Sequence, residues 1–80
     1  MALFLLRRRH AAPECDAAFA AWQGFPSPLR RRPAASICLA GGHEVWWRVE
    51  AADRLAALAL LPPYVATRTR AIAVRDVQIP

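Results

Sequence analysis

The pattern of apolar and polar positions predicts two strands, over residues 3–10 and 43–51. The first segment begins apolar and ends basic, and it contains neither glycine nor proline. In the second, Val45, Trp47 and Val49 alternate with residues such as Glu44 and Arg48. Such a period of two is typical of a strand with one buried face.

A helical period follows the first strand. Pro13 stands where the first turn of a helix tolerates proline, and the acidic residues Glu14 and Asp16 suit a helix N-terminus. Gly24 is a natural stop. Spacings of three and four residues place one set of side chains on a single face, which we expect to be buried: Cys15, Ala18, Phe19 and Trp22.

The remaining segments complete a pattern of strand, helix, strand, strand, helix, strand. Residues 25–33 hold three prolines and Arg30-Arg31-Arg32, which indicates a loop. Residues 34–40 form a second strand that Gly41-Gly42 joins to the third by a two-residue hairpin turn. Asp53 caps a helix over residues 54–61, which ends before Pro62-Pro63.

The last strand is expected over residues 67–77, with Ile72 and Val74 in the core. This order of elements is the ferredoxin-like βαββαβ unit, an α+β fold whose antiparallel sheet has the order 4-1-3-2 and two helices on one face. Eighty residues suffice for one domain, spanning residues 1–80.

A register between the first and third strands follows from the same alternation. Placing His10 opposite His43 aligns Leu6 with Trp47 and Phe4 with Val49 on the helix-covered face. A slip by one residue would bury Arg7 and Arg9 without partners. The helix-free face then receives a mixed set: Leu3, Leu5, Ile37, Leu39 and Trp46, with Arg7, Arg9, Glu44 and Arg48.

That mixed face predicts both local pairs and a partner. Arg9 lies opposite Glu44 as an ion pair, and Arg7 lies opposite Trp46 as a cation–π pair. The face is too apolar for plain solvent surface, so we expect a homodimer that packs through it. Trp46 is its expected anchor.

Composition narrows the classes of partner. The chain is 56% hydrophobic and carries a net charge of +5, with arginine as its only strongly basic residue. A basic domain attracts nucleic acid, anionic lipid or acidic metabolites. The chain lacks the aromatic and glycine pattern of RNA-recognition modules, and no apolar run is long enough to cross a bilayer. Without a signal-peptide pattern or a disulfide framework, we expect a cytoplasmic protein with reduced thiols and no membrane partner.

Two short motifs resemble a known family. Gly42-His43 opens a strand, and Leu61-Pro62-Pro63-Tyr64 follows the second helix. Over roughly residues 41–75 this arrangement is similar to that of the muconolactone isomerases. The resemblance implies a dimeric α/β barrel built on the ferredoxin-like unit, and isomerase activity as a candidate.

The topology brings several reactive side chains to one end of the sheet: His10, Cys15, Cys38, His43 and Tyr64. We predict His43 as the proton-transfer group, supported by Tyr64 and Glu44, because a histidine has a pKa near working pH. The substrate is expected to be a small anionic carboxylate compound. It would be bound on the helix-free face by a set of four residues: Arg7, Arg9, Trp46 and Arg48.

A second hypothesis concerns a metal. The spacings His-x4-Cys and Cys-x4-His, in His10, Cys15, Cys38 and His43, provide the residue types of a tetrahedral zinc site. No Cys-x-x-Cys is present, however, and free cysteines are often small buried apolar residues. The sequence therefore leads us to assign neither metal nor cofactor.

Three functions remain open. The favoured one is a small-molecule-binding dimeric barrel protein that acts as an isomerase or lyase. The alternative is a non-enzymatic dimeric binding or structural module. The third is non-specific nucleic-acid binding through arginine patches. The glycine-rich motifs of dinucleotide- and nucleoside-triphosphate-binding proteins are missing from the sequence.

Overall fold

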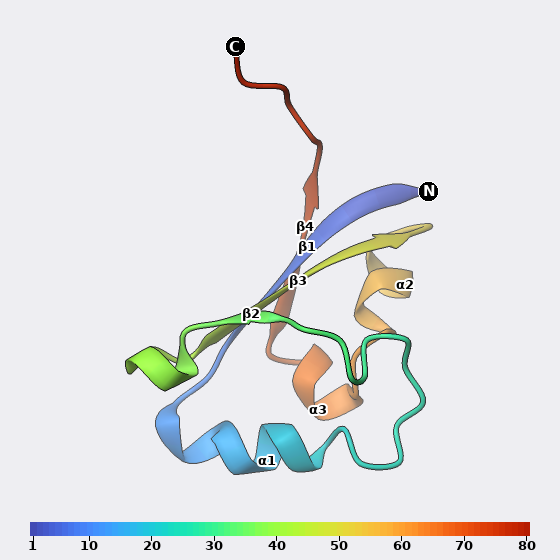
Figure 1. Cartoon of the computed structure of the whole chain (residues 1–80). Helices are drawn as coiled ribbons and strands as arrows, with labels where there is room; N and C mark the ends of the chain where they lie inside the picture. The colour runs from blue at the N-terminus through green and yellow to red at the C-terminus, as the bar shows by residue number, and fades with distance from the viewer.

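The chain folds around one twisted antiparallel sheet (Figure 1). This computed structural model describes residues 1–80, except for the side chain of Leu39. The strands are β1 (Ala2–Arg9), β2 (Ala35–Ser36), β3 (Glu44–Ala51) and β4 (Thr69–Val74). The helices are α1 (Cys15–Ala20), α2 (Arg54–Leu58) and α3 (Pro63–Ala66), with 3-10 turns η1 (Ala12–Glu14) and η2 (Cys38–Ala40). The strand order β2-β3-β1-β4 confirms the predicted order, taken from the other edge.

The predicted register of the two central strands is confirmed. Leu6 lies opposite Trp47, and Phe4 lies opposite Val49. Beyond the last strand pair, the His10 amide donates to the His43 carbonyl at 3.1 Å. Strand alternation excluded odd shifts, which would have exchanged the buried and exposed faces, and placing His10 opposite His43 selected one of the remaining registers.

The predicted hairpin between β2 and β3 is wrong in its register. Ala35, not Ile37, lies opposite Trp46, and β2 is only two residues long. The chain instead turns through η2 and returns at Gly41, whose φ of 94° is a left-handed conformation suited to glycine. The predicted pairing of Leu39 with Glu44 concerns a side chain outside the described part of the structure.

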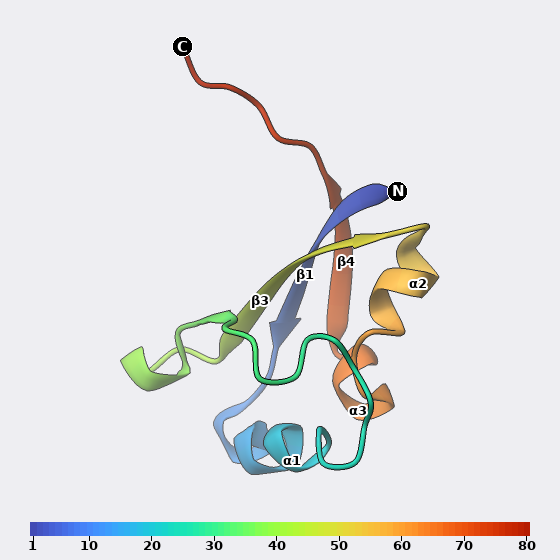
Figure 2. The ribbon, with the colours of Figure 1, turned by 45° about the vertical axis from the view of Figure 1, so that its right-hand side comes forward.

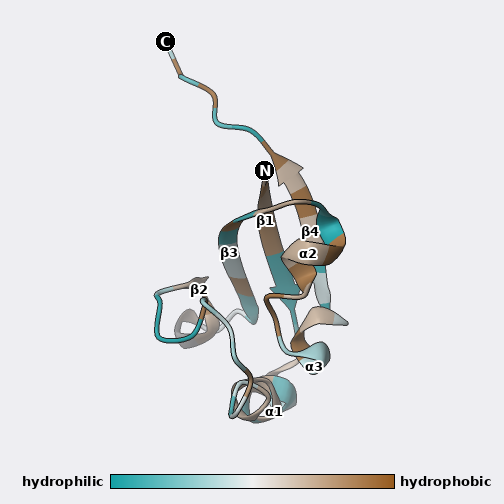
Figure 3. Cartoon of the chain, turned by 90° about the vertical axis from the view of Figure 1, so that its right-hand side faces the viewer, coloured by the Kyte–Doolittle hydropathy of each residue, from teal (hydrophilic) through white to brown (hydrophobic). Residues whose placement is uncertain are grey.

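The core lies between the sheet and the last two helices. Leu6, on the central strand, has no exposed surface, and it packs with Phe4 and Val49 from the same face of the sheet. Ala57 of α2 and Val65 of α3 close over them. Figure 3 shows β1 changing from hydrophobic near the N-terminus to hydrophilic at its far end. The compact core therefore occupies only part of the sheet.

The second predicted helix is correct at its start and wrong at its end. The Asp53 side chain accepts a hydrogen bond from the Ala56 amide at 2.8 Å, as expected for an N-cap. The helix stops at Leu58, and Pro63 begins a separate helix, α3, that the sequence analysis did not predict. Proline fits the first turn of a helix, so the Pro62-Pro63 pair ends one helix and starts another.

The core positions predicted for the last strand are also wrong. Ala71 is the buried residue of β4, whereas Ile72 is half-buried and Val74 is exposed. Ile72 lies opposite Leu5, and Val74 lies opposite Leu3, on the helix-free face. Small residues suit the covered face of β4 because α2 and α3 pack closely there.

Helix α1 does not bury the face that its spacing predicted. Ala18 is buried, but Phe19 is 73% exposed and Cys15 is only half-buried. The helix lies across one end of the sheet and packs lightly against it (Figures 1 and 2). Trp22 and Trp47, both predicted as core, do pack against the core, with ring centroids 6.0 Å apart. The light packing of α1 leaves space beside these two rings.

The helix-free face carries the predicted mixture of residues. A half-buried apolar stripe formed by Leu3, Leu5, Trp46 and Ile72 runs beside the charged residues. Residues 75–80 extend away from the sheet (Figure 2). Among the described helices, none has the length and apolarity needed to cross a bilayer.

Candidate functional site

A cavity of about 450 Å³ lies between α1 and the covered face of the sheet. Ala18 and Trp22 form one wall, Val45 and Trp47 of β3 form another, and Val65 of α3 lies at the inner end. The loop before β2 covers the cavity with Arg30, Arg31 and Arg32. The sequence placed the candidate pocket on the helix-free face, whereas this cavity lies on the opposite side of the sheet.

Arg8 gives this cavity its chemical character. It faces the helices from the end of β1 and is 1% exposed, which makes it the one buried charged side chain among the described residues. Its Nη1 donates to His10 Nδ1 at 2.6 Å. Its Nε and Nη2 are buried and have no hydrogen-bond partner in the described structure. Two strong donors of a cation are therefore unsatisfied in a side chain that lines the cavity.

The electric field at the cavity favours a negative charge. Burial lowers the pKa of the Arg8 guanidinium from its usual range, and the nearby Glu14 carboxylate opposes that effect. Arg8 stays protonated, because arginine keeps its charge in proteins. Arg30, Arg31 and Arg32 add three more positive charges, and no acidic residue is found among the described residues lining the cavity.

Four further side chains converge beside Arg8: His10, Cys15, Cys38 and His43. Their ligand atoms all lie within 4.8 Å of one another. His10 Nε2 is 3.1 Å from Cys15 Sγ and 3.7 Å from Cys38 Sγ, and Cys15 Sγ is 3.4 Å from His43 Nδ1. The predicted gathering of these residues at one end of the sheet is therefore observed. Hereafter they are called the His/Cys cluster.

The cluster is half-buried, and its surroundings disfavour charge. Burial lowers the pKa of His10, and the positive charges of Arg8 and His43 act in the same direction. Burial also raises the pKa of the Cys15 thiol, with Cys38 as the next cause. His10 is accordingly neutral, with Nδ1 accepting from Arg8, and Cys15 is a thiol near neutral pH.

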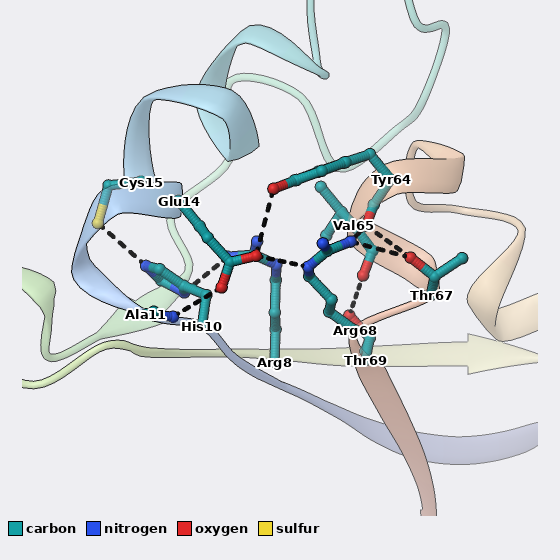
Figure 4. A network of polar contacts seen from close by, with 10 residues as sticks. All are labelled: Arg8, His10, Ala11, Glu14, Cys15, Tyr64, Val65, Thr67, Arg68 and Thr69. Carbon is teal, nitrogen blue, oxygen red and sulfur yellow. Dashed lines mark hydrogen bonds and ion pairs between the residues drawn. The ribbon is translucent and has the colours of Figure 1, made fainter.

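A second polar network connects η1 to α3 (Figure 4). Glu14 accepts a hydrogen bond from the Ala11 amide at 2.8 Å and pairs with Arg68 at 2.8 Å. The Tyr64 hydroxyl donates to the same carboxylate at 3.4 Å. The Ala11 amide and then Arg68 lower the pKa of Glu14. This network ties the N-terminal end of α1 to the end of α3.

The predicted catalytic group His43, Tyr64 and Glu44 is not brought together. His43 belongs to the His/Cys cluster, while the Tyr64 hydroxyl is bonded to Glu14. The Glu44 side chain bonds to Arg7 at 2.6 Å on the helix-free face, because neighbouring residues of a strand point to opposite sides. His10, and not His43, is the histidine that lines the cavity.

The predicted substrate-binding residues all lie on the helix-free face, but each arginine has an acidic partner. Arg7 and Arg9 pair with Glu44, at 2.6 and 3.4 Å, and Arg7 lowers the pKa of that carboxyl. Arg48 pairs with Asp76. Trp46 lines a shallower groove beside β2. Arg7 makes an ion pair in place of the cation–π contact that was predicted, and an anion on this face would compete with carboxylates already bound.

The sequence analysis missed Arg8, although a usable signal was present. Arg8 has the same parity as Phe4, Leu6 and His10, so the register that buries those residues also turns Arg8 toward the helices. The sequence-based prediction gave roles on the helix-free face to Arg7 and Arg9 and none to Arg8. The alternation required Arg8 to point inward.

Comparison with known proteins does not assign this chain to a family. The resemblance to the muconolactone isomerases stays a prediction, carried by Gly42-His43 and Leu61-Pro62-Pro63-Tyr64. Compared with family models, curated proteins and solved structures, the chain matches none of them.

Proposed function

We propose that this protein binds a small amphipathic carboxylate in the cavity between α1 and the sheet. The observation that carries the proposal is Arg8, a nearly fully buried guanidinium that has two unpaired donors and lines an apolar cavity. We keep the prediction, made from the sequence, that the ligand is an anion. Its site moves from Arg7, Arg9 and Arg48 to Arg8.

The energetics of a buried cation support this proposal. Removing a charge from water costs several kcal/mol unless partners compensate. His10 compensates one donor of Arg8, and Glu14 acts only at a distance. If the Arg8 side chain turns so that Nε and Nη2 face the cavity, a carboxylate there would accept two parallel hydrogen bonds, which is the strongest pairing available to a guanidinium.

The size and lining of the cavity select the rest of the ligand. A volume of about 450 Å³ falls within the range of pockets that hold small organic molecules. Trp22 and Trp47 offer aromatic surface, which suits an apolar or aromatic body attached to the carboxylate. Arg30, Arg31 and Arg32 would draw an anion toward the opening.

The isomerase or lyase activity predicted from the sequence is a more specific proposal than ligand binding. The proposal made here is binding, which that chemistry would require in any case.

A matched pair of probes tests the proposal. We expect 2-naphthoate to bind more tightly than 2-naphthalenemethanol by roughly 10- to 100-fold, since a charge-assisted hydrogen bond contributes about 1.5–3 kcal/mol. Isothermal titration calorimetry and quenching of tryptophan fluorescence measure both affinities. The Arg8→Met variant should bind both probes equally, while retaining the affinity for the alcohol.

Arg7→Met is the control, because Arg7 is the preceding residue and points to the helix-free face. It should leave the preference for the carboxylate unchanged. Equal binding of the two probes by the native protein would refute the proposal. So would a carboxylate preference that survives Arg8→Met.

We also propose, as the sequence suggested, that the helix-free face packs against a second copy to form a dimeric barrel. The exposed part of the face is apolar at its centre, where Leu3, Leu5, Trp46 and Ile72 lie, and its ion pairs flank that stripe. An isologous dimer buries the same patch of both copies. Exposed apolar patches of this kind mark interaction sites.

Trp46→Ala is expected to weaken such a dimer by about 10-fold or more, since aromatic anchors commonly contribute 2 kcal/mol or more. The fold of the protomer should be little affected, because Trp46 lies outside the buried core. Sedimentation equilibrium measures the dimer dissociation constant, and far-UV circular dichroism checks the fold. A monomeric native protein, or an unchanged dimer in the variant, would contradict this assignment.

A further inference from the structure

We propose that the His/Cys cluster binds one zinc ion, with His10, Cys15, Cys38 and His43 as its four ligands. This site lies beside the proposed anion pocket but does not depend on it. The sequence spacing alone did not support a metal, because it lacks a Cys-x-x-Cys pair. The argument rests on where the fold places the four ligand atoms.

The distances between ligand atoms are those of a tetrahedral site. With zinc bonds of about 2.0–2.3 Å, the edges of the tetrahedron measure about 3.3–3.8 Å. The three measured separations, 3.1, 3.4 and 3.7 Å, lie at or just below this range. All four ligand atoms lie within 4.8 Å of one another. Small side-chain shifts, apart for the closest pair of atoms and together for the most distant, would therefore give the spacing of a bound ion.

Four separate segments supply these ligands. His10 follows β1, Cys15 is the first residue of α1, Cys38 is the first residue of η2, and His43 precedes β3. The backbone bond from His10 to His43, 3.1 Å long, holds the two histidines at the end of the strand pair. The turn at Gly41 returns the chain from Cys38 to His43. Strand pairing and the turn at Gly41 thus help to bring the four ligands to the same point.

The alternative roles for these residues fit less well. Neither cysteine is fully buried, so neither is simply a small core residue. His43 has no backbone partner for its ring among the described hydrogen bonds, and its Nδ1 is directed at Cys15 Sγ. Two thiols and two imidazoles form a ligand set that suits zinc, and four protein ligands leave no open position. The site is therefore structural.

A structural ion would hold α1 against the end of the sheet, where few packing contacts do so. Helix α1 packs lightly against the sheet, yet it forms a wall of the cavity. Zinc would join α1, through Cys15, to the sheet and to the loop that carries Cys38. Coordination through His10 Nε2 places the ring proton on Nδ1, so Arg8 Nη1 would have to release that nitrogen and turn within the cavity.

The experiment uses the full chain, reduced and freed of metal. We expect one equivalent of zinc in a competition titration with a chromophoric chelator. Cobalt in its place should give the absorption of a tetrahedral ion, together with a sulfur-to-metal charge-transfer band. Zinc should also raise the melting temperature.

Variants identify the ligands. Cys38→Ser and His43→Gln should each weaken zinc binding by a factor on the order of 100 or more, because each removes one of four ligands. Cys38→Ser should also reduce the charge-transfer band, which His43→Gln should retain. Glu44→Gln is the matched control: Glu44 follows His43 but points to the opposite face, so zinc affinity should stay unchanged.

Folding and binding are separated by circular dichroism of the metal-free variants. If a variant is unfolded, the native protein decides the matter through its stoichiometry and its cobalt spectrum. The proposal fails if the reduced native protein binds no zinc, or if the cobalt spectrum lacks tetrahedral bands. It also fails if both single variants, when folded, bind zinc as the native protein does.

Discussion

Replacing Arg8 by methionine is expected to raise the free energy of unfolding by about 1–4 kcal/mol, the range found when buried ion pairs give way to well-packed apolar residues. Arg8 is 1% exposed and has two unpaired donors, so folding removes its charge from water with little return. Methionine is also an unbranched, flexible side chain, so it can occupy much of the space of Arg8 without a charge. Urea unfolding of the metal-free protein, monitored by tryptophan fluorescence, measures the change.

Arg7→Met is again the matched control. Arg7 is partly exposed and paired with Glu44, and such surface pairs contribute only about 0–1 kcal/mol. Its replacement should therefore change the stability little or lower it slightly. A destabilised Arg8→Met protein would show that the folded chain itself compensates the buried guanidinium. That result would remove the main support for an anion in the cavity.

A gain in stability accompanied by a loss of binding would explain why the position is charged. Functional groups often remain in surroundings that disfavour them, because binding requires an unsatisfied partner. Arg8 would then reduce the stability of the free protein and increase the affinity for its ligand.

The second large effect is expected at Leu6. Leu6→Ala should lower the free energy of unfolding by about 2–5 kcal/mol, since the cavity left behind adds to the lost burial. Leu6 has no exposed surface, and it lies on the central strand between Trp47 and Ala71. Small domains have only about 5–15 kcal/mol of stability, so much of it would be lost. Urea denaturation at low protein concentration measures this.

Leu5→Ala, compared with Leu6→Ala, tests whether the two faces of β1 contribute differently to the free energy of unfolding. Leu5 is half-buried on the helix-free face, so in the monomer its truncation should cost less than that of Leu6. At high concentration the cost should grow if this face forms the proposed dimer, because association adds to stability. Equal costs for Leu5 and Leu6 in dilute solution would contradict the assigned faces.

The sequence predicted the central strand pair because two physical constraints agreed there. Leu6, Trp47, Phe4 and Val49 require burial, and Arg7 requires the opposite face. The N-cap at Asp53 was predictable for a similarly local reason, since its side chain satisfies an amide three residues away. Such features depend on near neighbours or on strict alternation.

The sequence-based predictions are wrong where the packing of neighbouring helices and strands decides which residues are buried. Ile72 and Val74 are the larger apolar residues of β4, yet Ala71 is the residue that lies buried on the face that α2 and α3 cover. Phe19 follows the helical period of α1, yet α1 packs too lightly against the sheet to cover it. Apolar spacing shows which residues share a face, and only packing shows how much of that face is buried.

The amino-acid sequence by itself determined the order of strands, the register of β1 with β3 and the mixed character of the helix-free face. The strand order follows from the βαββαβ order of elements, and the register and the mixed face follow from side-chain alternation, which the backbone imposes on any strand. Only the tertiary structure decided that Arg8 is buried without enough partners, and that four ligand atoms meet within 4.8 Å. Both depend on distances between segments far apart in the chain, which are set when α1 and the loop before β3 close over one end of the sheet.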